Sequence, residues 1–395
     1  MTVASEPDLR QDFPVTKKTI YMNNGAVAPT SLAVVKAMTD FMIKCADEGP
    51  DSQATSDYIT ALLRELRVRV AHLINCEQEE VVLTQSTTDG MNAVANGIGW
   101  EKGDAVIVRG GKHEHPANYL PWLRLKEKGV MLSELAIDKD GFFDLGDLEK
   151  LARKSRLLTL SHALYNTGAI MPVEEAGKIA SENNVLFCID AAQTAGTIRV
   201  DVKKIGCDFI AFPGFKWLCG PMGMGVFYCS KKAAQALTPV AIGGESATFS
   251  GDTIAYMDMP RRLQAGFRNY PGAAGLEAAL RYVLRVGIDN VRAANVKVAN
   301  ALREELGRIN GIELYGPADE SRRTSIVTFT TPKDPPYIVS KLEEIGVVLA
   351  ERDAGNVKVV RAAPHFFNTE EEGSGGCGQD KGAFVATFSC HPGLL

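Results

Sequence analysis

Between residues 80 and 228 the chain alternates short apolar runs with helix-like segments, and this alternation limits the possible folds more than any other feature. The helix-like segments span residues 89–100, 116–129 and 173–184, with a short turn at 202–205. The apolar runs have the length of buried strands and read EVVLTQ, AVIVRG, MLSELAI, RLLTLSHAL, VLFCID, DFIAFP and GMGVFYCS. Strands that alternate with helices in this way predict a mainly parallel sheet with helices on both faces.

The ends of this pattern predict how the sheet closes. The last run, GMGVFYCS, follows FKWLCGPMG without an intervening helix, so we expect it to return antiparallel to its neighbour. An amphipathic segment at residues 58–74 precedes the first run and predicts a covering helix. Because ligand sites of α/β sheets lie at the carboxyl ends of the strands, we expect the functional residues at that edge.

Beyond about residue 260 the pattern changes. Helical segments at 273–286, 290–307 and 336–345 accompany a second set of short runs, IELYG, SIVTFTT, VVLAERD and VKVVRAAP. This mixture predicts a small α+β domain, on which the first twenty residues are expected to pack. The predicted fold class is therefore α/β, with a large, mainly parallel sheet domain and a small C-terminal domain.

The domain boundaries follow from these changes of pattern. A chain of 395 residues exceeds what one core usually organises, so we predict a large domain at 21–260 and a small domain made of 1–20 and 261–372. Residues 373–395 are glycine-rich and without helical period, directly after NTEEE, a helix start in which Asn368 would be the cap. We therefore predict an atypical tail there, with disorder as one interpretation.

Composition and charge exclude several classes of function. A formal net charge of -5 leaves no basic footprint for nucleic acid or for an anionic membrane. The N-terminal stretch is polar and no apolar run is long enough to span a bilayer, so we expect neither secretion nor a membrane span. The eight cysteines lack C-x-x-C spacing and the six histidines lack paired spacing, which predicts free thiols in a cytoplasmic protein without a metal.

Two polar residues stand at the ends of neighbouring apolar runs. Lys216 lies in DFIAFPGFKWLCGPMG, and burying its charged amine among so many apolar neighbours costs free energy unless the amine is neutralised or used. The alternative is a surface lysine whose amine reaches solvent. Asp190 closes VLFCID, where a buried carboxylate would keep the ring nitrogen of pyridoxal 5′-phosphate (PLP) protonated. The alternative for Asp190 is a helix N-cap.

Two further signals precede them along the chain. Ser86, Thr87 and Thr88, in QSTTDG, bring hydroxyls and backbone N–H groups to a predicted helix N-terminus, which favours a phosphate, although an ordinary capping box has the same pattern. His115, in KHEHPANYLPW, is placed either to stack on a flat ring or to be merely structural. Each signal is weak alone, but together they follow one another at successive strand ends, and this order favours a PLP enzyme.

The sequence resembles the class V aminotransferase and cysteine desulfurase group of fold-type I PLP-dependent transferases. Within that group it is similar to the isopenicillin N epimerase-like and cysteine/cystine lyase-like branch, over about residues 13–372. The resemblance is carried by YMNNGAVAPT, QSTTDGMN, EHPAN with PW, SHALYNTG, DAAQ, GFKW, AGFRNYPG and RAAPHFFNTEEE. It implies PLP as cofactor and a homodimer in which each chain helps to complete the other's site, and Asn269-Tyr270 in FRNYPG match the segment that reaches across.

The resemblance implies a role for each matching residue. Lys216 would hold PLP as an imine and move the α-proton of the substrate as general acid and base, with His115 as a second catalytic residue stacked on the ring. Asp190 would pair with the ring nitrogen, and Gln193 and His162 would lie near the phenolic oxygen. The phosphate would be bound by Ser86, Thr87, Thr88 and Tyr270. The substrate would be bound by Arg361, Asn24 and Asn269, with Arg361 clamping its carboxylate.

The sequence also departs from the desulfurases of this group. These enzymes carry a histidine directly before the lysine and a serine or threonine two residues ahead of that histidine, where this chain has Phe215 and Pro213. They also need a mobile cysteine in the loop before the carboxylate-binding arginine. The corresponding stretch here, AERDAGNVKVVR, is short and has no cysteine, so a persulfide-forming desulfurase is not expected.

These features imply a PLP-dependent enzyme that abstracts the α-proton of a small amino acid. We expect a C–S β-lyase acting on cysteine, cystine or a related S-substituted cysteine, and the alternatives are an amino-acid epimerase or a class V aminotransferase, because all share the loss of the α-proton. Phe215, Pro213 and the unusual tail keep open a PLP-binding paralogue without activity. A nucleotide-binding fold is excluded because QSTTDG is not G-x-G-x-x-G.

Overall fold

The computed structural model describes residues 9–374 of the chain. Its largest element is a seven-stranded sheet in the spatial order β2-β8-β7-β6-β5-β3-β4. These strands are β2 (Val81–Thr84), β3 (Ala105–Arg109), β4 (Met131–Leu135), β5 (Leu157–Ser161), β6 (Leu186–Asp190), β7 (Phe209–Pro213) and β8 (Gly225–Cys229). Strands β7 to β4 are paired in parallel, whereas β8 runs antiparallel to β7 and to β2. The predicted sheet is confirmed, including the antiparallel return of its last run.

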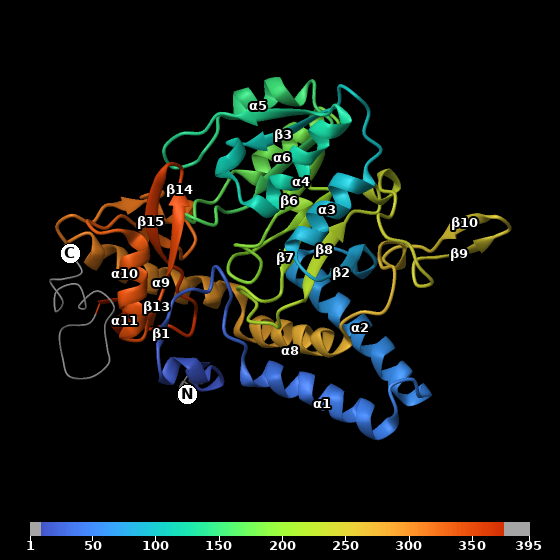
Figure 1. The fold of residues 1–395 in the computed structure, drawn as a ribbon, viewed down its shortest axis with the longest axis horizontal. Helices are drawn as coiled ribbons and strands as arrows, with labels where there is room; N and C mark the ends of the chain where they lie inside the picture. The colour runs from blue at the N-terminus through green and yellow to red at the C-terminus, as the bar shows by residue number, and fades with distance from the viewer. Residues whose placement is uncertain (1–8, 375–395) are drawn as a thin grey trace, which may run out of the picture.

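Helices cover both faces of this sheet (Figure 1). Successive side chains of a strand point to opposite faces, so in β3 Ile107 joins one buried apolar cluster while Val106 and Val108 join the other. The first cluster includes residues of α1 (Leu32–Glu48), α2 (Gln53–Ile74), α5 (Leu145–Ala152), α6 (Val173–Glu182), α7 (Val202–Ile205) and α8 (Tyr270–Val286). The second includes residues of α3 (Thr87–Gly97) and α4 (Leu120–Arg124).

Some predicted helices differ from the observed ones. The segment expected as one helix over residues 116–129 forms two short 3-10 turns and the five-residue helix α4. The reason is that Pro116 and Pro121 lack the backbone N–H that a continuous helix needs. Helices α1 and α5 were not predicted. Their termini carry ordinary caps, because the side chains of Ser31 and Asp144 accept hydrogen bonds from backbone N–H groups of the first turn.

A second, four-stranded antiparallel sheet lies at the other end of the molecule, in the order β11-β12-β15-β14. Its strands are β11 (Leu314–Tyr315), β12 (Val327–Phe329), β14 (Ala350–Ala354) and β15 (Val357–Ala362). A separate apolar cluster joins this sheet to α9 (Ile288–Leu306) and α10 (Pro335–Glu344). The α+β character predicted for the region beyond residue 260 is therefore present.

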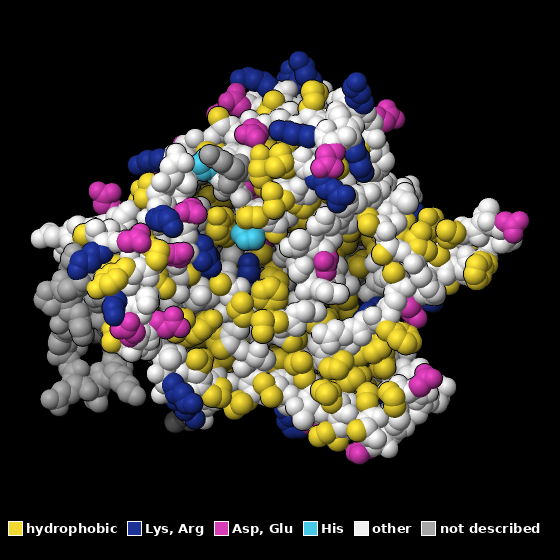
Figure 2. Space-filling view, in the orientation of Figure 1, with side chains coloured by type: hydrophobic (Ala, Val, Ile, Leu, Met, Phe, Trp, Pro, Cys, Tyr) yellow, Lys and Arg dark blue, Asp and Glu magenta, His cyan; other side chains and the backbone are white. Residues whose placement is uncertain are grey.

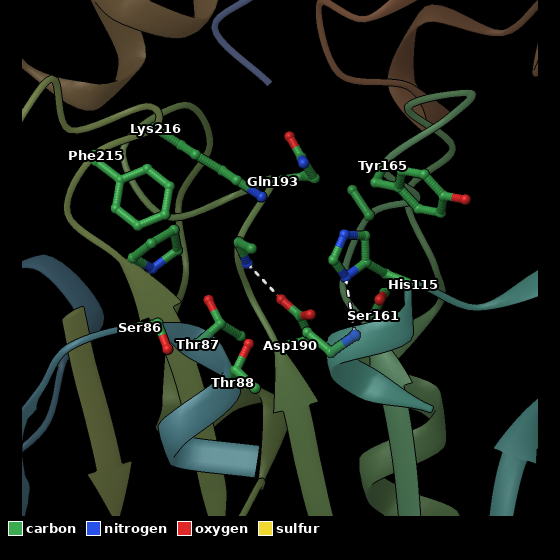
Figure 3. A pocket seen from close by; sticks show the side chains of 14 residues that line it. Ser86, Thr87, Thr88, His115, Ser161, Tyr165, Asp190, Gln193, Phe215 and Lys216 are labelled. Carbon is green, nitrogen blue, oxygen red and sulfur yellow. Dashed lines mark hydrogen bonds between the residues drawn. The ribbon is translucent and has the colours of Figure 1, made fainter. Parts of the chain in front are cut away.

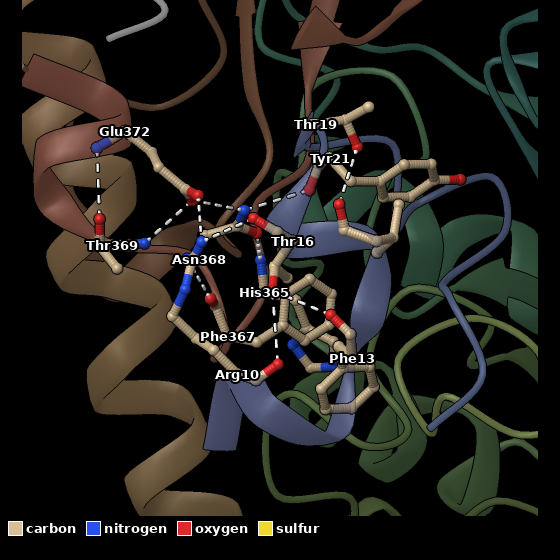
Figure 4. A network of polar contacts seen from close by, with 11 residues as sticks. Arg10, Phe13, Thr16, Thr19, Tyr21, His365, Phe367, Asn368, Thr369 and Glu372 are labelled. Carbon is tan, nitrogen blue, oxygen red and sulfur yellow. Dashed lines mark hydrogen bonds and ion pairs between the residues drawn. The ribbon is translucent and has the colours of Figure 1, made fainter. Parts of the chain in front are cut away.

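The N-terminal segment packs against this second part of the chain (Figure 4). Strand β1 (Ile20–Tyr21) pairs in parallel with β13 (Val347–Val348), and the Phe13 ring stacks on Phe367 at 4.4 Å between centroids. Arg10 donates to the backbone carbonyl of Phe367 at 2.8 Å and forms an ion pair with Glu372 at 2.7 Å. These contacts agree with the expectation that the N-terminus packs here.

The chain after β15 ends in α11 (Glu370–Ser374), and its cap differs from the one predicted. The Thr369 hydroxyl accepts the Glu372 N–H at 3.3 Å, and the Glu372 carboxylate accepts the Thr369 N–H at 3.2 Å, which is a capping box. The predicted cap, Asn368, instead accepts from the N–H of His365 and donates to the Tyr21 carbonyl. All but the first two residues of the predicted tail, 373–395, lie outside the described residues.

The domain boundaries stay a prediction, and two features bear on them. Helix α8 shares the apolar cluster of the large sheet, although its residues fall within the range assigned to the small domain. A hairpin of β9 (Ala247–Ser250) and β10 (Thr253–Tyr256) projects from the body, with Phe249 92% exposed. Within residues 9–374 we find no helix with the length and apolar character needed to cross a membrane.

Candidate active site

A cavity of about 110 Å³ lies at the carboxyl ends of β5, β6 and β7, beside the N-terminus of α3 (Figure 3). The predicted site residues that line it are Ser86, Thr87, Thr88, His115, Asp190, Gln193 and Lys216. It is also lined by Pro213 and Phe215, the two departures from the desulfurase pattern, and by Ser161, Ala163 and Tyr165, which the sequence did not single out. The structure therefore brings together residues from five separate stretches of sequence.

Lys216 follows β7 in a tight loop. The Gly220 N–H donates to the Gly214 carbonyl at 2.8 Å, and the Cys219 N–H donates to the Lys216 carbonyl at 2.9 Å, so the loop folds back on the strand. The Lys216 side chain extends into the cavity (Figure 3). Burial lowers the pKa of its amine, Asp190 opposes this and Arg361 adds to it, and the net pKa is about 8. Near neutral pH a useful fraction of this amine is neutral, as nucleophilic chemistry requires.

Asp190 is the last residue of β6 and lies beside Ser161 of β5 in the register of the sheet. One carboxylate oxygen accepts the Ala192 N–H at 2.8 Å. Burial raises the pKa of the carboxyl to about 6, although the charge of Lys216 opposes the rise. A buried carboxylate that holds a proton this readily suits a protonated ring nitrogen as its partner.

The N-terminus of α3 forms the floor of the cavity. Ser86 is the N-cap, and its hydroxyl accepts the Asp89 N–H at 3.3 Å. The Thr87 hydroxyl oxygen is buried and has no hydrogen-bond partner within residues 9–374. Gly90 lets the helix approach the sheet, because a Cβ there would lie 2.6 Å from the Cβ of Ala211. The helix thus presents backbone N–H groups and an unpaired hydroxyl to the cavity, which is how proteins bind phosphate.

His115 is a neutral ring in this site. Its Nδ1 accepts the Ala117 N–H at 3.1 Å, so the ring hydrogen is on Nε2. Burial, together with the positive charges of Lys216, Arg352 and Arg361, lowers the pKa of His115 to about 4. A ring that is uncharged and already accepting at Nδ1 is suited to stacking, but it is a poor proton carrier near neutral pH, which weighs against the predicted catalytic role.

His162 does not line the cavity, which corrects its predicted placement. Ser161, Ala163 and Tyr165 do line it, and the chain leaves the strand after Ser161 through a bend at His162 and a turn that begins at Tyr165. His162 is buried, its pKa is lowered to about 4 by burial, and its Nδ1 has no partner among the described residues. Tyr165 is the residue that sequence reasoning missed, because it lies past the end of β5.

A buried ion pair lies directly behind the cavity wall. Glu114 and Arg109 are 3.3 Å apart, and both side chains are 1% exposed. The Glu114 carboxylate also accepts the Ser161 hydroxyl at 2.7 Å and the His115 backbone N–H at 3.0 Å. Glu114 therefore holds two of the residues that line the cavity, and nothing in the local sequence pattern indicated this role.

Arg361 and Asn24 lie next to the cavity rather than on its wall. Arg361, on β15, donates to the Tyr165 carbonyl at 2.6 Å and to Asn23 Oδ1 at 3.1 Å, while its Nε has no partner among the described residues. Burial, together with the charge of Arg352, lowers the pKa of Arg361 to about 9. Asn24 donates to the Ala363 carbonyl at 2.8 Å, and its side-chain oxygen has no partner within residues 9–374.

Asn269 and Tyr270 do not reach the cavity of their own chain. Asn269 caps α8 by accepting the Gly272 N–H at 2.9 Å, and it lines a second cavity of about 640 Å³. Tyr270 packs near Phe41, with 6.5 Å between ring centroids. The contact of Asn269 and Tyr270 with a neighbouring chain's site stays a prediction. Among the described residues, no three His, Cys, Asp or Glu side chains are grouped to hold a metal ion.

Comparison with known proteins identifies the family. Residues 20–370 match the model of the aminotransferase class-V family. The chain belongs to this family. Class-V enzymes use PLP, and the resemblance read from the sequence, the fold-type I architecture and the cofactor are confirmed. The class-V match also makes this chain a PLP-dependent enzyme.

Individual class-V relatives are similar over nearly their whole length. The chain is 35% identical to a probable cysteine desulfurase of Methanothermobacter thermautotrophicus, over 92% of this chain and 94% of that protein. The apo cysteine desulfurase from Thermococcus onnurineus NA1 has a TM-score of 0.88 at 32% identity, covering 94% and 96% of the two chains. The cystine C–S lyase C-DES, in complex with its reaction product cysteine persulfide, has a TM-score of 0.84 at 26% identity, covering 91% and 96%. These relatives do not support the epimerase-like branch.

The residues of this class-V chain fit PLP. The unpaired, buried hydroxyl of Thr87 lies at the helix terminus that would hold the phosphate. The buried Lys216 amine and the buried Asp190 carboxylate line the same cavity, and each acts on the pKa of the other. A cavity with these three groups has the donors, the nucleophile and the carboxylate that PLP requires.

Proposed function

We propose that this class-V chain is a C–S β-lyase that cleaves cysteine, cystine or a related S-substituted cysteine. The observation that carries the proposal is the cavity in which the Lys216 amine and the Asp190 carboxylate lie next to Arg361, a buried cation without a carboxylate partner among the described residues. Similarity to desulfurases and to a cystine C–S lyase supports cleavage of a carbon–sulfur bond rather than epimerisation or transamination.

Different cavity residues would bind different parts of the cofactor. Lys216 would bind PLP covalently, Asp190 would hold the proton of its ring nitrogen, and the N-terminus of α3 with Thr87 would bind its phosphate. His115 would stack on the ring as a neutral imidazole. PLP, when bound, withdraws electrons from the α-carbon of an amino acid and so makes its α-proton acidic. Arg361 would bind the substrate carboxylate and fix the amino acid in one orientation.

Lys216 is the residue suited to move the α-proton. Its pKa of about 8 lies close to neutral pH, where a general base and acid is most effective, whereas the pKa of His115 lies near 4. Loss of the α-proton and of the β-sulfur substituent from cysteine, followed by addition of water, gives pyruvate, ammonia and sulfide. With cystine the leaving group is cysteine persulfide, so no thiol of the enzyme has to accept sulfur.

The structure around Arg361 supports a lyase over a persulfide-forming desulfurase. Strands β14 and β15 are joined by a two-residue turn, Gly355-Asn356, so this stretch forms a hairpin without a long loop or a cysteine. Of the described cysteines, Cys188, Cys207, Cys219 and Cys229 are buried, and burial raises the pKa of each thiol. No cysteine of residues 9–374 lines the cavity.

A homodimer is part of the proposal. Phe215 and Pro213 give the phosphate end of the cavity an apolar wall, and among its lining residues only the turn at Ser86, Thr87 and Thr88 supplies hydroxyls there. A segment from a second copy, containing Asn269 and Tyr270, would complete this end. The exposed Phe249 and Phe267, 92% and 88% accessible, supply apolar surface for the association.

The proposal is tested by the products that the enzyme forms. The purified protein with PLP should show a visible absorption band, and with cystine or cysteine it should release equimolar pyruvate and ammonia. Alanine as the product would instead indicate a desulfurase, and a keto acid formed only with an added amino-group acceptor would indicate an aminotransferase. The K216A variant should lose turnover, while K203A, an exposed lysine on α7, serves as the matched control. Binding of amino acids without any product would favour the inactive paralogue.

A further inference from the structure

Trp217 follows the active-site lysine and has no part in the chemistry described so far. Its side chain is fully buried, and it packs with Ile326 and Ala363 in a small apolar cluster. Its indole N–H donates to Oε1 of Gln193 at 2.9 Å. An indole N–H can only donate, so the atom that it meets must be the oxygen of the Gln193 amide and not the nitrogen.

The nitrogen of the same amide is held from another direction. Gln193 Nε2 donates to the Gly25 carbonyl at 3.0 Å, and Gln193 lines the cavity. An amide nitrogen carries two hydrogens, and the second one has no acceptor within residues 9–374. Gln193 therefore offers the cavity a hydrogen-bond donor, because its only acceptor oxygen is already turned toward the indole.

We propose that Trp217 is a positioning residue that keeps an N–H of Gln193 directed into the cavity, where the phenolic oxygen of PLP would lie. The inference rests on the role proposed for Gln193 and goes beyond it, because it assigns the orientation of the amide to a residue outside the cavity. Trp217 does not line the cavity, so it acts on the cofactor only through Gln193.

The indole is needed because another donor competes for the amide oxygen. A Cβ at Gly25 would lie 3.3 Å from Arg361 Nη1 and equally 3.3 Å from Gln193 Oε1, so the guanidinium and the amide oxygen flank the same small space. Without the indole, a buried oxygen is left without its donor, which is unfavourable. The amide then gains by turning toward Arg361, and its nitrogen moves away from the cavity.

Trp217 itself is held in place from the second sheet. Nε2 of His365, in the segment that follows β15, lies 2.9 Å from the Trp217 carbonyl oxygen, and the two rings meet edge to face at 5.1 Å. Burial lowers the pKa of His365 to about 3, so the ring is neutral, and its hydrogen must be on Nε2 because a carbonyl only accepts. In both hydrogen bonds, from His365 to Trp217 and from Trp217 to Gln193, the donor and the acceptor are thus fixed.

The test is the pH midpoint of the visible absorption band of the PLP-loaded protein. A donor withdraws charge from the phenolic oxygen and lowers the basicity of the chromophore, so the W217F variant should raise the midpoint by about 0.5–1 pH unit, the size of one neutral hydrogen bond. Q193L should raise it at least as much. W122F removes the indole N–H of an equally buried tryptophan, which donates to Asn118, and should leave the midpoint unchanged.

The double variant Q193L/W217F decides whether Trp217 acts through Gln193. If it does, the double variant has the midpoint of Q193L alone, whereas an additive shift would overturn the inference. A shift in Q193L with none in W217F also overturns it and leaves the role of Gln193 intact. No shift in either variant means that the proposed role of Gln193 is wrong, and the inference with it. Should W217F fail to fold, benzothienylalanine at position 217, which replaces the N–H by sulfur at nearly the same size, gives the same readout.

Discussion

Lys216 lies between groups of opposite charge that act on its amine in opposite directions. Burial lowers the pKa, Asp190 opposes this by favouring the ammonium form, Arg361 adds to it by repulsion, and the net pKa is about 8. Because the neutral amine is the nucleophile, these groups set the pH range in which the cofactor-free protein can bind an aldehyde. The reactivity of one residue therefore reports on the electrostatics of the whole cavity.

We predict that acetylation of Lys216 in the cofactor-free protein has a pH midpoint near 8. The D190N variant should lower the midpoint, because it removes an anion that stabilises the ammonium. The R361Q variant should raise it, because it removes a repelling cation. Competitive labelling with acetic anhydride, followed by mass spectrometry, measures the midpoint, and the exposed lysines of the same digest are the reference. A midpoint above 10, unmoved by either substitution, would show that the amine is not buried beside these charges.

In our proposal the N-terminus of α3 binds the phosphate of PLP. A substitution at Thr87 should affect PLP binding and protein stability in different directions. Its unpaired, buried hydroxyl costs stability in the cofactor-free protein. The T87V variant should keep or raise the melting temperature of that protein and weaken PLP binding by about tenfold or more, since hydrogen bonds to charged groups are the stronger ones. Fluorescence titration with PLP and thermal unfolding measure the two effects.

Thr55, at the start of α2, is the matched control for this prediction. Its buried hydroxyl donates to the Gly49 carbonyl at 2.8 Å and is far along the chain from the cavity residues. T55V should therefore lower the melting temperature and leave the PLP affinity unchanged. Equal effects of T87V and T55V on both measurements would contradict the assignment of Thr87 to the phosphate.

The β14–β15 hairpin is the element that separates a lyase from a persulfide-forming desulfurase. Without a cysteine in that hairpin, release of pyruvate should not depend on any thiol of the chain. The C45S/C377S/C390S variant, treated with iodoacetamide, should keep pyruvate formation from cystine within about twofold of the untreated wild type, while Cys76 is a weak nucleophile because burial raises its pKa to about 12. Complete loss of product on this treatment would indicate a catalytic thiol.

At the scale of the whole molecule, the two sheets are joined around the cavity. His365 links the segment after β15 to the loop of Lys216, and Arg361 of β15 donates to the Tyr165 carbonyl. On the face shown in Figure 2, apolar side chains gather around α8 and α2 and reach the stem of the β9–β10 hairpin. This surface is where we expect the second copy to bind.

We predict that the protein is a dimer and that its hairpin face forms the contact. The substitutions F249D and F267D place charges on residues that are 92% and 88% exposed, and together they should dissociate the dimer and weaken PLP binding. Y337D, on α10 at the second sheet, is the control and should do neither, although Tyr337 is also exposed (45%). Sedimentation velocity measures the association. A wild-type protein that is monomeric and fully active would rule out active sites shared between two chains.

Local sequence was sufficient to predict the seven strands of the large sheet and the edge at which the cavity residues lie, although it did not predict helices α1 and α5. The runs VLFCID and DFIAFP form β6 and β7, and Asp190 and Lys216 follow from them because the carboxyl ends of parallel strands meet at one edge. The position of Thr87 at the start of α3 also follows from its local pattern, whereas the lack of a partner for its hydroxyl within residues 9–374 does not. Strand and helix periods repeat over a few residues, so a short window of sequence contains them.

Only the tertiary structure decided which side chains face the cavity and what holds them. Tyr165 lines the cavity and His162 does not, because the chain bends and turns directly after β5. The donation from Trp217 to Gln193 and the packing of Arg361 against Gly25 join segments that are far apart in the chain. Such contacts depend on how separate elements are oriented in three dimensions, and no local period of the sequence encodes that orientation.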